Sequence, residues 1–146
     1  MSIEDDVALL ERVPTLRLLG TTALRMLAIG SESREFARGD QLFNAGDEAD
    51  AGYIVQRGAF RVEDGGAEII AGPGALIGEL ALIVAMKRPS SAVAIDNSTA
   101  IRVARSLFQR VLESDPAAAL RLRDEFAIRS SQIASDILMA GSKLST

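Results

Sequence analysis

One short segment of the chain combines side chains that could hold a phosphorylated ligand. Gly78 and Glu79 open an apolar run. Arg88 follows ten residues after the glycine, and Ser90 and Ser91 then add two hydroxyls. A guanidinium pairs with phosphate oxygens, a carboxylate accepts hydrogen bonds from sugar hydroxyls, and glycine lets backbone approach a ligand closely. This combination indicates binding of an anionic sugar phosphate.

The composition argues against several other kinds of chemistry. The sequence contains no His and no Cys, so the commonest general base, the commonest metal ligand and all thiol chemistry are missing. A small β-barrel enzyme of the cupin type, which depends on a His-rich metal site, is therefore not expected. Pairs of oxygen-bearing side chains at Glu63-Asp64 and Asp96-Asn97 lack calcium-loop spacing and indicate turns. We expect a binding protein with no catalysis, no cofactor and no metal.

The elements that must position this segment fall into three parts. Helical apolar spacing marks residues 3–12 and 15–30, with Pro14 opening the second helix. From about Phe36 to Val103 short apolar stretches alternate with glycines, which predicts a sandwich or jelly roll. The predicted strands contain Tyr53-Ile-Val, Phe60-Arg-Val, Glu68-Ile-Ile and Ala92-Val-Ala-Ile.

Helix is expected again after Arg105. A short helix spans about 106–113, and Asp115 and Pro116 supply the N-cap and first residue of a long helix that runs to about Ala140. Gly141 can end that helix. An apolar stripe along it packs on its own domain or forms a dimer seam. The stripe contains Leu122, Phe126, Ile133 and Ile137.

Several blocks in this order resemble the cyclic nucleotide-binding domain, the family shared by catabolite-activator-type regulators, protein kinase regulatory subunits and cyclic nucleotide-gated channels. The most specific block is residues 74–83, Gly-Ala-Leu-Ile-Gly-Glu-Leu-Ala-Leu-Ile, followed by Arg88. Residues 39–47 and 53–58 resemble earlier strands and turns of the same family. The resemblance covers nearly the whole chain. It implies one α+β domain over residues 1–146.

In that domain N-terminal helices (1–34) and C-terminal helices (105–146) flank a β-roll, a jelly-roll-like barrel (35–104), with a phosphate-binding cassette at 76–92. The resemblance also implies roles for individual residues. Glu79 accepts the ribose 2′-hydroxyl, and Arg88 pairs with the exocyclic oxygens of the cyclic phosphate. Backbone N–H groups of Leu80 and Ala81 point toward the phosphate from a short helical turn. The implied ligand-binding set is Ile77, Gly78, Glu79, Leu80, Ala81, Arg88, Pro89, Ser90, Ser91, Arg129 and Ile133.

The long helix covers the pocket in this family. Arg129 matches a position that pairs with the cassette carboxylate, and a solvated helix residue is the alternative. Ile133 matches a position that faces the base, with plain core or a dimer seam as its alternatives.

Pro89 departs from the family pattern. Family members commonly follow the arginine with Ser, Ala or Thr, whose N–H touches phosphate, whereas proline has no N–H. Ser90 or Ser91 takes over this contact, or affinity falls below the family's usual range. Since members selective for cyclic GMP often place Thr or Ser directly after the arginine, cyclic AMP is the expected ligand, with cyclic GMP as the other candidate.

The predicted function is a cyclic nucleotide receptor that relays a conformational change of its helices to an effector protein. The alternative is a structural domain of the same fold that binds no ligand. The net charge of −4, the acidic N-terminus and the lack of an 18-residue apolar stretch predict a cytoplasmic protein with no nucleic-acid or membrane partner. After the long helix only residues 141–146 follow, too few for a helix-turn-helix. We expect a monomer or weak dimer.

Overall fold

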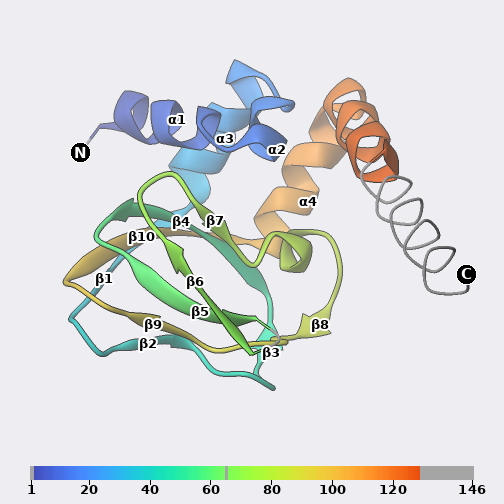
Figure 1. Cartoon of the computed structure of the whole chain (residues 1–146). Helices are drawn as coiled ribbons and strands as arrows, with labels where there is room; N and C mark the ends of the chain where they lie inside the picture. The colour runs from blue at the N-terminus through green and yellow to red at the C-terminus, as the bar shows by residue number, and fades with distance from the viewer. Residues whose placement is uncertain (1, 65, 129–146) are drawn as a thin grey trace, which may run out of the picture.

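Two antiparallel four-stranded sheets face one another and form the roll (Figure 1). The computed structural model describes residues 2–64 and 66–128. One sheet has the order β1-β10-β4-β7 and the other the order β2-β9-β5-β6, while β3 and β8 form a separate pair. The strands are β1 Glu32–Phe36, β2 Gln41–Phe43, β3 Glu48–Ala49, β4 Ala51–Arg57, β5 Phe60–Asp64, β6 Ala67–Ala71, β7 Leu76–Ile77, β8 Met86–Lys87, β9 Ala92–Ala94 and β10 Ser98–Ala104. The predicted α+β β-roll with flanking helices is confirmed.

Helices from both ends of the chain lie on one side of the roll, above β4 and β10 in Figure 1. They are α1 Ile3–Glu11, α2 Pro14–Arg17, α3 Thr21–Gly30 and α4 Arg105–Ser114. Ser2 caps α1, because its side chain accepts from the Asp5 N–H and the Asp5 carboxylate accepts from the Ser2 N–H. No helix in residues 2–64 and 66–128 is long and apolar enough to cross a membrane.

The helix predicted over residues 15–30 is wrong in one respect, since the structure divides it into α2 and α3. Gly20 separates the two with a backbone φ of 84°, a left-handed value that a continuous helix does not contain. Leu19 and Leu24 stay buried on either side of the break. The apolar spacing therefore predicted correctly which residues are buried, but it did not predict the break at Gly20.

Two clusters of buried side chains fill the fold. One lies between the helices and the outer face of β4 and β10, where Ile54 and Val103 meet helical residues such as Leu24. The other lies inside the roll, where Val55 and Phe60 are fully buried. Because successive residues of a strand point to opposite faces, β4 contributes to both clusters and is apolar along most of its length.

The four strand-forming stretches named from the sequence lie in β4, β5, β6 and β9, as predicted. The strands β1 and β10 are among those that the sequence analysis did not assign. β1 begins at Glu32, before the predicted start of the roll at residue 35, and it has no apolar alternation because most of its side chains are exposed. It is held by antiparallel pairing with β10, from Glu32 opposite Arg102 to Phe36 opposite Ser98. Pairing between segments that are far apart in the chain leaves no pattern in the local sequence from which the strand could be predicted.

A further helix occupies residues 116–128 after α4. As predicted, Asp115 caps it, since its Oδ1 accepts from the Ala118 N–H at 3.1 Å. Ala118 and Leu122 are buried against the helical cluster, and the Arg121 Nε donates to the Leu18 carbonyl at 2.8 Å. This part of the helix is therefore docked on the N-terminal helices. The predicted continuation to Ala140 and the end at Gly141 lie outside the described residues.

Candidate functional site: a cavity lined by the cassette

A cavity of about 230 Å³ lies against the segment singled out from the sequence. Eight of the eleven predicted ligand-binding residues line it: Ile77, Gly78, Glu79, Leu80, Ala81, Arg88, Pro89 and Ser90. The rest of the lining is Phe43, Ala49, Val62 and Met86. The fold therefore brings most of the predicted site to one place, between the 3₁₀ turn after β7 and the strands on either side.

A left-handed glycine turns the chain into the cavity wall. Gly78 has φ 79° and ψ 38°, and the 3₁₀ helix η1 (Glu79–Leu82) begins directly after it. The Ala81 N–H donates to the Gly78 carbonyl at 3.1 Å and so closes the turn. Of the two N–H groups predicted to face a phosphate, that of Ala81 is thus used within the turn. The Leu80 N–H has no backbone acceptor among the described residues.

Arg88 is held in place by its own backbone. Its N–H donates to the Asp47 carbonyl at 2.7 Å, and its carbonyl accepts from the Gly46 N–H at 2.8 Å. These bonds extend the pairing of β3 with β8, in which Glu48 lies opposite Lys87. The turn at Gly46, where φ is 91°, lets the chain double back beside Arg88. The segment therefore places the Arg88 side chain in the roll with little freedom.

The Arg88 guanidinium is buried among aromatic rings. Only 5% of the residue is exposed. Nη2 donates to the Ala51 carbonyl at 2.8 Å, and Cζ lies 4.1 Å from the centre of the Phe43 ring and 5.7 Å from that of Tyr53. Nε is buried and has no hydrogen-bond partner. One hydrogen bond and two rings thus hold a group that has five N–H donors.

This burial leaves a positive charge that has no counter-ion in the part of the chain that the structure describes. Burial lowers the pKa of Arg88, against opposing effects of Tyr53 and Asp50, but arginine titrates so far above neutrality that it stays charged. No carboxylate of the described residues lies within 4.0 Å of it. Burying an ion costs several kcal/mol, whereas a desolvated cation–π contact returns about 2 kcal/mol. The remaining deficit favours an anion beside Arg88.

Phe43 and Tyr53 were not predicted as site residues. Phe43 lies in the block 39–47, and Tyr53 opens an apolar strand, so both looked like ordinary core residues in the sequence. Their rings meet at a centroid distance of 6.2 Å. Nothing in their spacing reveals that Arg88, far along the chain, stacks against them.

The hydroxyls that follow Pro89 have separate roles. Pro89 and Ser90 line the cavity, whereas Ser91 is not part of its lining. Instead the Ser91 Oγ accepts from the Ala45 N–H at 2.8 Å, and its carbonyl accepts from the Glu63 N–H at 3.2 Å. Ser91 therefore ties the cassette to neighbouring segments of the roll. Ser90 is the hydroxyl next to the cavity.

The long C-terminal helix, which was predicted to cover the site, lies only partly within the described residues. None of residues 116–128 lines the cavity. Arg129 and Ile133, which the resemblance implied as contacts, lie outside the described residues.

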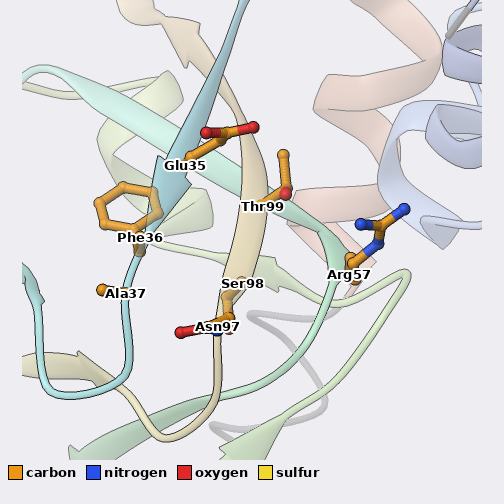
Figure 2. Close-up of a pocket in the computed structure, with 7 residues that line it drawn as sticks. All are labelled: Glu35, Phe36, Ala37, Arg57, Asn97, Ser98 and Thr99. Atoms are coloured by element: carbon orange, nitrogen blue, oxygen red, sulfur yellow. The ribbon is translucent and has the colours of Figure 1, made fainter.

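A larger hollow elsewhere on the roll, of about 410 Å³, contains no predicted site residue. Figure 2 shows Glu35 and Arg57 there on different strands, with Thr99 between them. Both charged side chains are exposed. The buried Ser98 hydroxyl is already satisfied, since it donates to the Asp96 carbonyl at 2.8 Å and accepts from the Ala59 N–H at 3.1 Å. This hollow lacks the uncompensated buried charge that marks the cassette cavity.

Comparison with known proteins agrees with this geometry. Residues 33–115 match the family described as the cyclic nucleotide-binding domain, and the chain belongs to that family. It is 30% identical over 120 residues to the cAMP-dependent protein kinase regulatory subunit of Debaryomyces hansenii. This alignment covers 74% of the chain but only 26% of the regulatory subunit, so the chain spans about a quarter of that relative.

Solved structures give the same result. The chain is similar to a cyclic nucleotide-binding-like protein from Brucella abortus, with 36% identity, a TM-score of 0.65 and coverage of 75% of this chain and 98% of that one. It also resembles the N-terminal domain of a transcriptional regulator from Streptomyces coelicolor, with 27% identity, a TM-score of 0.76 and coverage of 86% and 94%. The fold and the position of the cassette therefore define a cyclic nucleotide sensor domain.

The contact between Gly78 and Arg88 gives a first prediction. A Cβ on Gly78 would lie 2.5 Å from the Arg88 Nη1, whereas one on Gly39, whose φ is also positive at 92°, would meet nothing within 4 Å. Both Gly→Ala changes should cost about 1–2 kcal/mol of backbone strain. Gly78→Ala should cost about 1–2 kcal/mol more, because the guanidinium must leave its carbonyl and rings. Urea denaturation measures both values.

The Arg88→Met background is the control for this comparison. There the additional cost of Gly78→Ala should disappear, as a double-mutant cycle would show. Equal destabilisation by the two glycine substitutions in the wild-type background would contradict the contact.

Proposed function

We propose that this domain binds cyclic AMP in the cassette cavity and catalyses no reaction. The observation that carries the proposal is the buried Arg88 guanidinium, which has no counter-ion among the described residues and borders a cavity that Glu79 also lines. A cyclic nucleotide supplies the two matching groups, an anionic phosphate for the guanidinium and a ribose hydroxyl for the carboxylate. The family to which the chain belongs gives the ligand class.

The proposed ligand position follows from the donors around the cavity. The cyclic phosphate lies against Arg88, whose Nε–H has no partner among the described residues, and the Leu80 N–H and the Ser90 hydroxyl are further donors on residues of the lining. The ribose lies toward Glu79 at the start of η1. Apolar side chains of Phe43, Val62 and Met86 complete the wall.

The preference for cyclic AMP over cyclic GMP rests on Pro89. A proline directly after the arginine offers neither an N–H nor a hydroxyl at that position. Cyclic GMP-selective relatives often carry Thr or Ser there. The cavity wall at this point is correspondingly less polar. This suits cyclic AMP, the ligand that needs fewer hydrogen-bond donors from the protein.

The response to ligand is proposed to run through the C-terminal helices. Residues 116–128 are docked on the N-terminal helices by Leu122 and by the bond from Arg121 to Leu18. Arg129 and Ile133, which follow, are proposed to reach Glu79 and the base. A ligand shifts such an equilibrium only through contacts made in one state and not in the other. The relay ends on an effector protein.

The location, oligomeric state, domain extent and partners of the protein belong to the same proposal. A cytoplasmic location and a monomeric or weakly dimeric state remain predictions, as does one domain over 1–146. The absence of a nucleic-acid partner also stays a prediction, because one similar structure is the N-terminal domain of a transcriptional regulator.

A second candidate is a structural domain whose cavity binds no ligand. Pro89 favours it, because the proline removes a usual phosphate donor. The bond from Arg88 to the Ala51 carbonyl also favours it, since it occupies one guanidinium N–H. Titration with ligand decides between the two candidates.

Calorimetric titration should detect cyclic AMP binding at one site per chain, with Kd between about 1 nM and 1 μM. Arg88→Met should lower affinity at least about thirtyfold, because the phosphate loses its buried charged partner. It should leave the free energy of unfolding unchanged or raised, since an apolar group replaces an uncompensated ion. Arg57→Met, at the hollow in Figure 2, is the matched control and should bind normally.

Unaltered affinity in folded Arg88→Met protein would reject the role of Arg88. If saturating cyclic AMP and cyclic GMP both leave the wild-type melting temperature and NMR spectrum unchanged, the cavity binds neither and the second candidate holds.

Glu79→Gln tests the ribose contact separately. A neutral amide accepts a weaker hydrogen bond than a carboxylate, so affinity for cyclic AMP should fall about tenfold. The same substitution should have no effect on binding of 2′-deoxy cyclic AMP, which lacks the hydroxyl. An equal loss for both ligands would show that Glu79 acts on the cassette as a whole.

A chain that ends at residue 128 tests the proposed cover. It should retain the melting temperature of the roll and bind cyclic AMP about tenfold more weakly, a loss of about 1.4 kcal/mol. In the full chain, hydrogen exchange across residues 125–140 should slow when cyclic AMP is added. If truncation leaves the affinity intact and hydrogen exchange does not change, the helix has only a structural role. The response to ligand would then be transmitted through the N-terminal helices.

A further inference from the structure

Arg105, the first residue of α4, contacts the cassette directly. Its Nη1 donates to the Ala49 carbonyl at 2.8 Å, the Val84 carbonyl at 3.1 Å and the Ala81 carbonyl at 3.3 Å. Its backbone N–H donates to the Asp50 carbonyl at 2.8 Å. One residue thus joins α4 to the end of β3 and to the far end of the η1 turn.

These contacts replace a side-chain cap at the N-terminus of α4. The N-cap position of α4 is Ala104, which has no side chain that can accept from the helix N–H groups. The Asp50 carbonyl accepts the first of them instead. The start of α4 is therefore fixed on the roll by Arg105 itself, and its position depends on where β3 and the η1 turn lie.

The same contacts orient the η1 turn. Ala81 lines the ligand cavity, while its carbonyl accepts from Arg105 on the other side. The Val84 carbonyl, just after the turn, accepts from the same nitrogen. Any ligand that moves Glu79, Leu80 or Ala81 consequently changes the distance between these carbonyls and the Arg105 guanidinium.

We propose that Arg105 is a positioning residue: it holds the cassette turn in its ligand-accepting orientation and transmits movement of that turn to α4. The transmission half of this inference rests on the proposed cyclic nucleotide binding. The orienting half does not, because it follows from the hydrogen bonds of Arg105 alone. Arg105 itself does not line the cavity.

The charge of the side chain and its number of hydrogen-bond donors explain why residue 105 is basic. Three carbonyl oxygens converge on one nitrogen, so an apolar residue would leave them without that donor. A lysine ammonium has three donors and could serve the same carbonyls after a small shift, although it lacks the planar fork. Lysine should therefore rescue the function and methionine should not.

The test compares Arg105→Met, Arg105→Lys and the control Arg110→Met, an exposed arginine on the same helix. Hydrogen exchange is measured without ligand and with saturating cyclic AMP, and Kd is measured by calorimetry. Without ligand, Arg105→Met should speed exchange of the Ile83 and Val84 N–H groups, which donate to the Leu80 carbonyl. Its Kd should rise about tenfold.

The decisive measurement is the response of α4 at saturation. In the wild type and in Arg110→Met, cyclic AMP should slow exchange in residues 79–84 and in α4. In Arg105→Met it should slow exchange only in residues 79–84, and Arg105→Lys should restore at least half of the α4 response. A merely stabilising residue would change exchange throughout the fold by the same factor.

The outcomes separate this inference from the proposed function. If the wild type binds cyclic AMP and Arg105→Met keeps the full α4 response, the transmitting role is wrong. If the wild type binds no cyclic nucleotide, the proposed function fails and the transmitting role fails with it. In that case faster exchange at Ile83 and Val84 in ligand-free Arg105→Met still supports the orienting role, and unchanged exchange overturns it.

Discussion

The buried guanidinium of Arg88 is the constraint on which the rest of the site depends. A charge with 5% exposure and a single hydrogen bond, to the Ala51 carbonyl, is costly to the folded protein. The surrounding structure is arranged to tolerate it: Phe43 and Tyr53 supply their ring faces, and Gly78 leaves out the side chain that would collide with Nη1. These contacts hold the guanidinium in one position, and such positioning reduces the ordering that binding of an anion would require.

The two buried clusters separate the layer that contains the cavity from the layer that contains the helices. The cluster inside the roll carries the cavity wall, whereas the cluster between the roll and the helices carries α4 and residues 116–128. β4 belongs to both, with Tyr53 facing inward and Ile54 facing the helices. Adjacent residues of one strand therefore touch the arginine of the site and the helical layer. Arg105 adds a polar link between the same two layers.

Relatives of this domain occur within larger proteins, and the chain spans about a quarter of one regulatory subunit. The proposed change in the position of the adjoining helices suits such an arrangement, because those helices can contact different partners in different proteins. In this proposal the ligand is recognised in the roll, and the partner is determined by what the helices contact. This division explains how kinase regulators and transcriptional regulators can share one ligand-binding fold.

The sequence by itself determined the family, the roll and the cassette, because Gly78, Glu79 and Arg88 are local in the chain and their spacing is specific. It also determined the cap at Asp115, which depends on a neighbouring N–H. Only the tertiary structure decided that β1 pairs with β10, that Ser91 binds the Ala45 N–H and that Phe43 lies over Arg88. Each of these contacts joins residues distant in sequence or depends on burial, so no local periodicity or propensity encodes it.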